Sequence, residues 1–155
     1  MDRVTATLPD SVAELCLLRF GLVARRWPAV PFLRRMCNGA VRWANSPESQ
    51  EAGLLHSESF RLAWNHAGLL QYWRSFAELD AWSHRTPHSD WWRQINDRIR
   101  RKGDIGVYHE TFLVPRSSYE SIFVNCPPVG GMAFGALGAP TGKMTVSRDR
   151  LGRRG

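Results

Sequence analysis

Two adjacent residues, His109 and Glu110, are the side chains best suited to acid/base chemistry. Imidazole and carboxylate groups transfer protons near neutral pH when burial shifts their pKa values. Both lie in an apolar stretch, residues 105–114, that is typical of a β-strand. Because neighbouring side chains on a strand point to opposite faces, only one of the two can enter a given cavity. Either could be the general base, or either could be a buried polar residue that holds strands and helices together.

Three other residues, Tyr72, Arg74 and His88, could polarise a hydroxyl or carbonyl group of a substrate. Tyr72 and Arg74 share one side of a short alternating strand, residues 69–74, and His88 precedes a helix. Phenol, guanidinium and imidazole groups can each donate a hydrogen bond to developing negative charge. Arg74 could instead be a cation at the sheet edge, and His88 could be a helix-cap or surface residue.

Aromatic side chains could form the wall of a substrate pocket. Seven tryptophans occur among 155 residues, and an indole ring offers a broad flat surface to a planar ligand. The residues expected to contact a substrate are Trp73, Trp91, Trp92, Tyr108, Tyr119 and Asn125. Trp73 could also belong to the core, and Tyr119 and Asn125 could be structural hydrogen-bonding residues.

Several cofactor and catalytic motifs are missing from the sequence. It has no Ser-His-Asp, phosphate-loop or dinucleotide-binding pattern, which argues against a hydrolase, a kinase or a dehydrogenase. The three cysteines have no metal-ligand spacing, and Pro87 breaks the helix that would align His84 with His88, so we expect no metal site. There is no CxxCH for covalent haem. Noncovalent haem would need one axial ligand and an apolar slot.

Two helices should position these groups. Ser75 and Glu78 form a capping box, so a helix should start at Phe76 and end before Pro87. A second helix should begin near Ser89 and end at Gly103, after three basic residues.

The remaining elements predict the fold. Strands are expected at 14–24, 53–60, 69–74, 105–114 and 119–125, with a helix at 32–45 and a loop at 46–52. This βαββααββ order is that of an α+β, ferredoxin-like antiparallel sheet with its helices on one face. The bare face of such a sheet is best covered by a second copy, so we expect a homodimer of the dimeric α+β barrel type.

The ends of the chain are expected to add little to that domain. Residues 1–9 show no regular spacing of apolar residues and should pack loosely. The Gly/Pro-rich stretch after Pro127 should be irregular. We therefore predict one domain over residues 1–130 and a tail over 131–155. Five basic residues and one acid in 139–155 supply +4 of the net charge of +7, so nucleic-acid binding is not expected. No apolar run reaches membrane length and no signal peptide begins the chain, so we expect a cytoplasmic protein without a membrane partner.

An ordered series of motifs across residues 15–130 resembles a known family, the domain of unknown function 4188. Its members are often named "monooxygenase family protein". The motifs are Gln71-Tyr72-Trp73-Arg74-Ser75-Phe76, then His88 with Trp92 and Asn96, Gly106-Val107-Tyr108-His109-Glu110-Thr111, Tyr119-Glu120-Ser121-Ile122 and Asn125-Cys126-Pro127-Pro128. A wider resemblance extends to antibiotic-biosynthesis monooxygenases and to haem-binding dimeric α+β barrels. This chain departs from the family pattern after Gly21 and in an expanded turn at residues 47–56.

The resemblance implies a natural-product tailoring enzyme. Our leading hypothesis is a cofactor-independent enzyme that dehydrates and cyclises a polyketide-type intermediate by acid/base chemistry in an apolar aromatic cavity. The alternatives are a haem-binding monooxygenase or aldoxime-dehydratase-like enzyme with His88 or His109 as axial ligand, and a noncatalytic ligand-binding protein of a biosynthetic complex.

Overall fold

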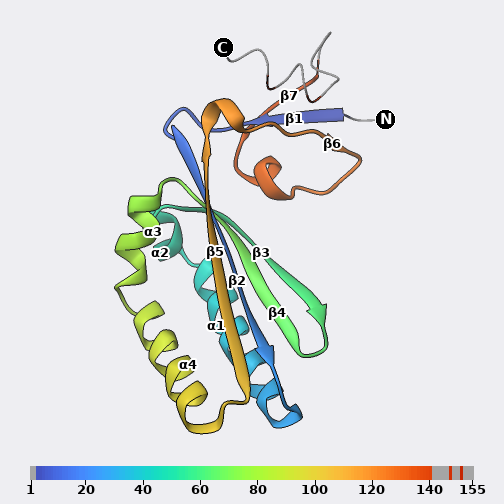
Figure 1. Ribbon diagram of the computed structural model, residues 1–155. Helices are drawn as coiled ribbons and strands as arrows, with labels where there is room; N and C mark the ends of the chain where they lie inside the picture. The colour runs from blue at the N-terminus through green and yellow to red at the C-terminus, as the bar shows by residue number, and fades with distance from the viewer. Residues whose placement is uncertain (1–2, 141–146, 148–150, 152–155) are drawn as a thin grey trace.

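The main body of the protein is a four-stranded antiparallel sheet with helices on one face. The computed structural model describes residues 3–140, 147 and 151. The strands are β2 (Glu14–Ala24), β3 (Leu54–Ala63), β4 (His66–Trp73) and β5 (Ile105–Pro115), in the spatial order β3-β4-β2-β5 (Figure 1). β2, the first of these four strands in the sequence, thus pairs with β4 and β5, the third and the fourth. This arrangement confirms the ferredoxin-like α+β fold expected from the sequence.

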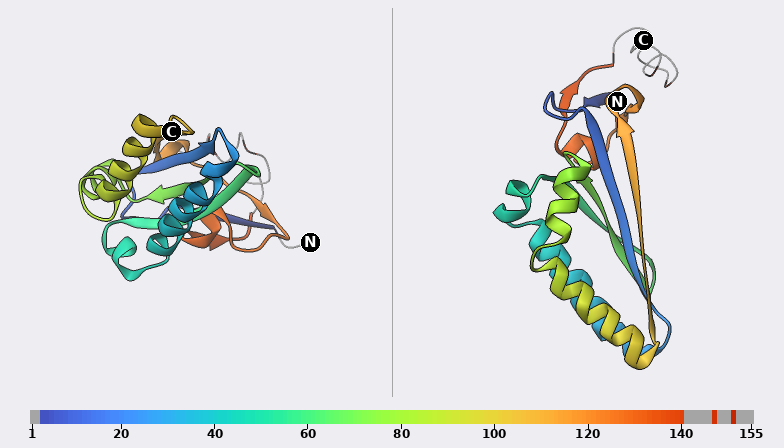
Figure 2. Two further views of the ribbon diagram at one scale, coloured as in Figure 1. Left: turned by 90° about the horizontal axis from the view of Figure 1, so that it is seen from below. Right: turned by 60° about the vertical axis from the view of Figure 1, so that its left-hand side comes forward.

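Three helices form the second layer. They are α1 (Val30–Ala44), α3 (Phe76–Ser83) and α4 (His88–Lys102), and they lie on the same side of the sheet (Figure 2). α1 starts earlier than predicted because Pro31 lies in its first turn, where a missing backbone N–H costs nothing. A short helix, α2 (Pro47–Glu51), occupies the predicted loop. Within the described residues, no helix combines the length and the apolarity that crossing a membrane would require.

The predicted start of α3 and the predicted end of α4 are confirmed, whereas α3 ends at Ser83, before the predicted stop at Pro87. The Ser75 hydroxyl accepts a hydrogen bond from the Glu78 backbone N–H at 3.3 Å and donates to the Glu78 carboxylate at 2.9 Å. At the other end of the helical pair, α4 ends at Gly103, whose positive φ of 58° fits a left-handed C-terminal cap. Local sequence signals therefore fix where α3 begins and where α4 ends.

The chain ends form a second, smaller sheet that the sequence did not predict. β1 (Arg3–Thr7) lies between β6 (Phe123–Val124) and β7 (Ala136–Gly138). The expectation of a loosely packed N-terminus was wrong, since Thr5, Ala6 and Leu8 are buried. The predicted strand 119–125 is reduced to β6, and it pairs with β1 rather than with the main sheet. The predicted boundary between a domain over residues 1–130 and a tail over residues 131–155 stays a prediction. Most of the basic part of that tail lies outside the described residues.

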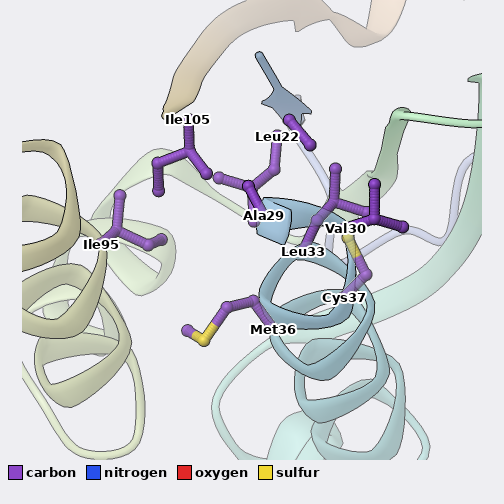
Figure 3. Packing of buried hydrophobic residues seen from close by; sticks show 9 residues of the cluster. Leu22, Ala29, Val30, Leu33, Met36, Cys37, Ile95 and Ile105 are labelled. Atoms are coloured by element: carbon purple, nitrogen blue, oxygen red, sulfur yellow. The ribbon is translucent and has the colours of Figure 1, made fainter. Parts of the chain in front are cut away.

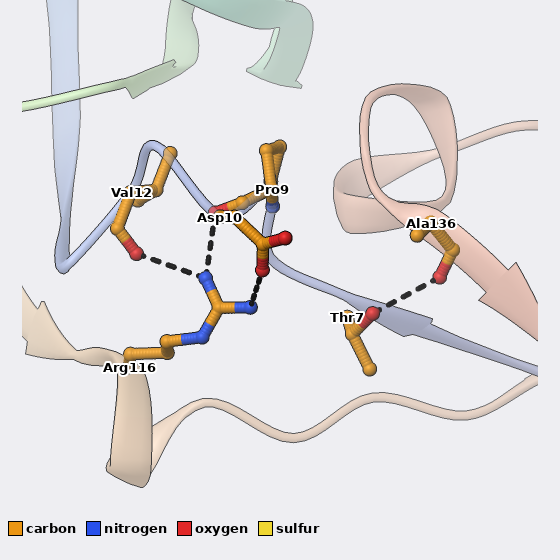
Figure 4. A network of polar contacts seen from close by, with 6 residues as sticks. All are labelled: Thr7, Pro9, Asp10, Val12, Arg116 and Ala136. Carbon is orange, nitrogen blue, oxygen red and sulfur yellow. Dashed lines mark hydrogen bonds and ion pairs between the residues drawn. The ribbon is translucent and has the colours of Figure 1, made fainter.

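One arginine fastens the N-terminal segment to the end of β5. The Arg116 guanidinium donates hydrogen bonds to the carbonyl oxygens of Pro9, at 2.6 Å, and Val12, at 3.2 Å (Figure 4). It also contacts the Asp10 carboxylate at 3.0 Å, while the Thr7 hydroxyl donates to the Ala136 carbonyl. A single side chain thus satisfies carbonyl groups that no strand partner reaches.

The core is divided into three apolar clusters. The largest cluster joins α1 and α4 to the part of the sheet where β2 ends and β5 begins. Figure 3 labels its members Leu22, Ala29, Val30, Leu33, Met36, Cys37, Ile95 and Ile105. A second cluster stacks three indoles, with Trp43 4.3 Å and Trp73 5.2 Å from Trp82 between ring centroids. The third cluster contains Leu8, Val12 and Leu15 and lies under the small sheet.

The helix-free face of the sheet is covered in part by the chain itself. The backbone N–H of Gly130 donates to the Glu58 carboxylate at 2.5 Å, and the Phe134 ring lies 5.3 Å from that of Tyr72. The rest of this face, which includes Arg19 and Glu110, carries no covering element among the described residues. The expectation of a wholly bare face therefore needs correction at the end where the small sheet lies.

Candidate active site

Two histidines from different elements line the same cavity between the sheet and the helices. His109 comes from β5, where it pairs with Phe20 and points toward the helices, and His88 is the first residue of α4. The cavity is partly open, has a volume of about 70 Å³ and adjoins a groove of about 390 Å³. Both spaces are bordered by Leu18, His88, Trp92 and His109. A molecule in the groove would thus reach both imidazoles.

The backbone fixes the tautomer of His88. Its Nδ1 lies 2.6 Å from the carbonyl oxygen of Ser83. A carbonyl can only accept a hydrogen bond, so Nδ1 carries the proton and Nε2 of the neutral ring has a free lone pair. The Trp82 ring packs beside the imidazole, with centroids 4.6 Å apart, and restricts its rotation.

Burial lowers the pKa of His88 below its ordinary value. The hydrogen bond to the Ser83 carbonyl opposes that shift, and the nearby rings of His109 and His84 lower the pKa further. The neutral form therefore dominates at neutral pH. A neutral, oriented imidazole beside an apolar cavity has the properties of a general base.

Aromatic rings and one amide complete the lining. Trp92 stacks on His109 at a centroid distance of 6.3 Å and an interplanar angle of 18°. Gln71 is buried, lines the cavity and accepts a hydrogen bond from the Trp73 indole N–H at 3.2 Å. The indole N–H of Trp82 is buried without a hydrogen-bond partner among the described residues. Sequence analysis missed Gln71 and Trp82, although the position of Gln71 on the helix-facing side of β4 could have indicated it.

The structure separates the catalytic residues that the sequence suggested. His109 and His88 lie together at the cavity, but Glu110 is on the opposite face of the sheet, 2.6 Å from Arg19. Arg74 pairs with Glu78 at 2.6 Å, beside the start of α3. Tyr72 also lies on the helix-free face, where burial, followed by Glu58 and Tyr119, raises its pKa to about 12. Glu110, Arg74 and Tyr72 are therefore not in contact with the two histidines.

The predicted substrate-contacting residues divide in the same way. Trp91 and Trp92 line the cavity, whereas Trp73 is fully buried in the core. Tyr108 borders the cavity but directs its hydroxyl to His66, at 2.9 Å, on the other face. Tyr119 packs beneath the small sheet, and Asn125 follows β6 with a φ of 51°. Neither of these last two residues lines the cavity.

Comparison with known proteins places the chain in a family. A family profile described as "Monooxygenase af470-like" matches residues 15–131, which include the main sheet except for Glu14, the first residue of β2, and all residues that line the cavity. The chain belongs to the monooxygenase af470-like family. Monooxygenase af470 of Aspergillus fumigatus is 30% identical over 83 residues, which make up 51% of this chain and 30% of the relative. The chain thus spans less than a third of that relative's length. The narrower assignment to domain of unknown function 4188 stays a prediction.

Solved structures share the fold at low sequence identity. An aldoxime dehydratase in complex with butyraldoxime superposes with a TM-score of 0.69 and 17% identity over 98% of this chain and 43% of its own. A second aldoxime dehydratase superposes with a TM-score of 0.70 and 15% sequence identity, over 99% of this chain and 44% of its own. A possible oxidoreductase of unknown function from Bacteroides thetaiotaomicron superposes with a TM-score of 0.52 and 10% sequence identity, over 66% of this chain and 99% of its own. These likenesses establish the fold and not the reaction.

The cavity does not fit haem, the cofactor that the wider resemblance suggested. His88 offers a suitable free imidazole nitrogen, and the surrounding rings are apolar. The inner cavity of about 70 Å³, however, is far below the roughly 300–1,000 Å³ of pockets that hold drug-sized ligands, and the adjoining groove of about 390 Å³ lies near the lower end of that range. A porphyrin, which is larger than most drug-sized ligands, is too large for either space. No cluster of three or more potential metal ligands occurs in the described part of the chain.

Proposed function

We propose that this protein is a cofactor-independent tailoring enzyme that removes water from an apolar, polyketide-type intermediate and closes a ring on the product. The observation that carries the proposal is the pair His88 and His109 at one aromatic cavity, with the Nδ1 proton of His88 held by the Ser83 carbonyl. The groove of about 390 Å³ lies near the lower end of the range for small-molecule sites, so it suits one compact substrate.

The first step would be elimination. Nε2 of His88 takes a proton from the carbon next to a substrate carbonyl, and His109, which enters the cycle in its protonated form, donates a proton to the hydroxyl group on the following carbon. The carbon–oxygen bond breaks, a carbon–carbon double bond forms, and water leaves. The amide of Gln71 is placed to stabilise the enolate oxygen by donating a hydrogen bond. This moves the base from His109 or Glu110, suggested by the sequence, to His88, because its neutral tautomer is fixed.

Ring closure would restore both histidines. A second hydroxyl group of the substrate adds to the double bond and gives its proton to His109, while protonated His88 returns a proton to the enolate carbon. The aromatic walls hold the two ends of the substrate near each other, which lowers the entropic barrier to cyclisation. No external oxidant or reductant is consumed.

Family membership favours a second candidate, oxygenation of the same carbon. After His88 removes the proton from a CH2 group, the carbanion could add molecular oxygen to give a hydroperoxide, which then loses water to leave a carbonyl group. The carbon loses four electrons in all, and of the two oxygen atoms one stays in the carbonyl group and the other leaves as water. The same base would serve both reactions.

The test is turnover of β-hydroxy-carbonyl polyketide analogues by the purified protein, followed by mass spectrometry and an oxygen electrode. Loss of 18 mass units without oxygen uptake, whether the product is the alkene or the ring isomeric with that alkene, supports dehydration and cyclisation. Stoichiometric oxygen uptake would instead establish the second candidate. Tight product binding without turnover of any analogue would contradict both and favour a noncatalytic binding protein.

We also propose that two copies associate through the helix-free face of the sheet. Phe112 is 48% exposed on that face and lies beside the half-exposed Arg19 and Glu110. A second copy would cover this surface. Sedimentation equilibrium should give twice the chain mass, and Phe112→Arg should lower it to the monomer value; a monomeric wild-type protein would contradict the proposal.

A further inference from the structure

One end of the molecule gathers three chain connections that carry exposed aromatic and basic side chains. They are the loop after β2, the β3–β4 hairpin turn and the turn from α4 to β5, all at the end opposite the small sheet (Figures 1 and 2). The backbone N–H groups of Ala24 and Arg25 donate to the carbonyls of Asn65 and Asp104, at 2.8 Å each. These bonds connect the three segments into one surface, here called the basic tip.

The basic tip is rich in cations without counterions. Arg98 and Arg100 pair with Asp104 and Asp97. Five others are exposed and form no ion pair with any described residue: Arg25, Arg26, Arg61, Arg101 and Lys102. With seven cations and two carboxylates, the basic tip has a net charge of +5.

Large apolar side chains protrude among these charges. Trp27 is 69% exposed and Trp64 55% exposed, and their rings are in contact, with centroids 5.2 Å apart. Leu62, on the same hairpin, is 59% exposed. Two exposed indoles in contact bury little surface of their own and leave most of it in water, which marks an interaction surface.

We propose that the basic tip attaches the protein to the surface of an anionic lipid bilayer. Tryptophan is enriched at the depth of lipid headgroups, where its ring is in an apolar layer and its N–H remains hydrated. Basic residues beside it contact lipid phosphates, and each contributes through the negative surface potential. The combination of protruding Trp and Leu with unpaired cations matches that interface in both polarity and charge. This departs from the sequence-based expectation of no membrane partner, which considered only spanning segments and signal peptides.

The experiment is cosedimentation of the full chain with vesicles of phosphatidylcholine containing about 30% phosphatidylserine, with pure phosphatidylcholine vesicles as reference. We expect binding to the anionic vesicles only, weakened by added salt. Arg25→Glu with Arg26→Glu should lower the partition coefficient at least about tenfold. Trp27→Ser with Trp64→Ser should lower it about fivefold or more.

A matched charge reversal controls for net charge. Arg42→Glu with Arg85→Glu changes two exposed arginines away from the basic tip, one in the last turn of α1 and one in the connection between α3 and α4, so binding should stay within about twofold of wild type. Far-ultraviolet circular dichroism checks that each variant is folded. Equal binding by the tip variant and this control would overturn the proposal, as would wild-type protein that ignores anionic vesicles. Equally tight binding to polyglutamate, with no effect of the tryptophan changes, would overturn it in favour of an acidic protein partner.

Discussion

The two faces of the main sheet place chemically similar groups in opposite surroundings. On the helix-covered face, His109 lies against Trp92 and shares a cavity with His88, whose pKa burial lowers. On the helix-free face, the next residue, Glu110, forms a half-exposed ion pair with Arg19. The covering layer, more than residue type, therefore decides which polar groups of β5 can act as acids or bases.

The largest expected effect is on turnover. His88→Gln should lower kcat by about 10²- to 10⁴-fold, because the proposed base is lost while a polar side chain of similar size remains. Glu110→Gln, one residue from His109 but on the other face, should change kcat less than about twofold. Single-turnover assays with the best analogue would measure both. A strong loss for Glu110→Gln with full activity in His88→Gln would reverse the assignment of the faces.

Side chains on the two faces of the main sheet should also differ in how much they stabilise the folded protein. Trp73→Ala should lower the free energy of unfolding by about 3–5 kcal/mol, since the fully buried indole contacts Trp43 and Trp82. Phe112→Ala, at a position 48% exposed in the single chain, should cost less than about 1 kcal/mol in protein dilute enough for the proposed dimer to dissociate. Urea denaturation of each variant at neutral pH measures the difference. Similar losses for both would mean that the helix-free face is as well packed as the core.

The lowered pKa of His88 predicts a pH dependence with a definite sign. In the unfolded chain this histidine has its ordinary pKa of 6.5, so below that pH the unfolded state binds a proton that the folded state resists. The contribution of neutral His88 to the free energy of unfolding is therefore fully present above pH 6.5 and is lost as the pH falls through the folded-state pKa of His88. Urea midpoints should decline from pH 7 to 5 more steeply in wild type than in His88→Gln. Parallel declines would show that His88 is not desolvated.

The smallest effect is expected at the Arg19–Glu110 ion pair. Both side chains are more than a third exposed, so solvent screens their attraction. Replacing both, as Arg19→Gln with Glu110→Gln, should change the free energy of unfolding of the single chain by less than about 1 kcal/mol. A double-mutant cycle in thermal denaturation would measure the coupling in protein dilute enough for the proposed dimer to dissociate, and a value above that limit would contradict the screening of the pair.

Local signals predicted most of the main sheet and its helices. The Ser75 capping box, Pro87 and Gly103 are short-range instructions, and the structure follows each of them. The alternation of β5 likewise predicted that His109 and Glu110 would separate, although not which of them would face the helices. That choice depends on the register with β2, where His109 opposes Phe20 and Glu110 opposes Arg19, a long-range property.

Non-local pairing explains what the sequence did not predict. β1 has only five residues, and its partners lie more than a hundred positions away, so no local period reveals it. The site was incomplete for a similar reason. The carbonyl of Ser83, which sets the tautomer of His88, is a backbone group that carries no sequence signature.

The small sheet has a practical consequence for handling the protein. Thr5 pairs with Gly138, so the first and last described strands are hydrogen-bonded neighbours. A chain shortened to Gly138 could be cyclised through its backbone by a brief linker back to Arg3, since the two points lie beside each other in the sheet. All residues that line the cavity and its groove fall between Leu18 and Thr111, so the closed ring would leave them in place. Such a ring would have no free end for an exopeptidase to attack.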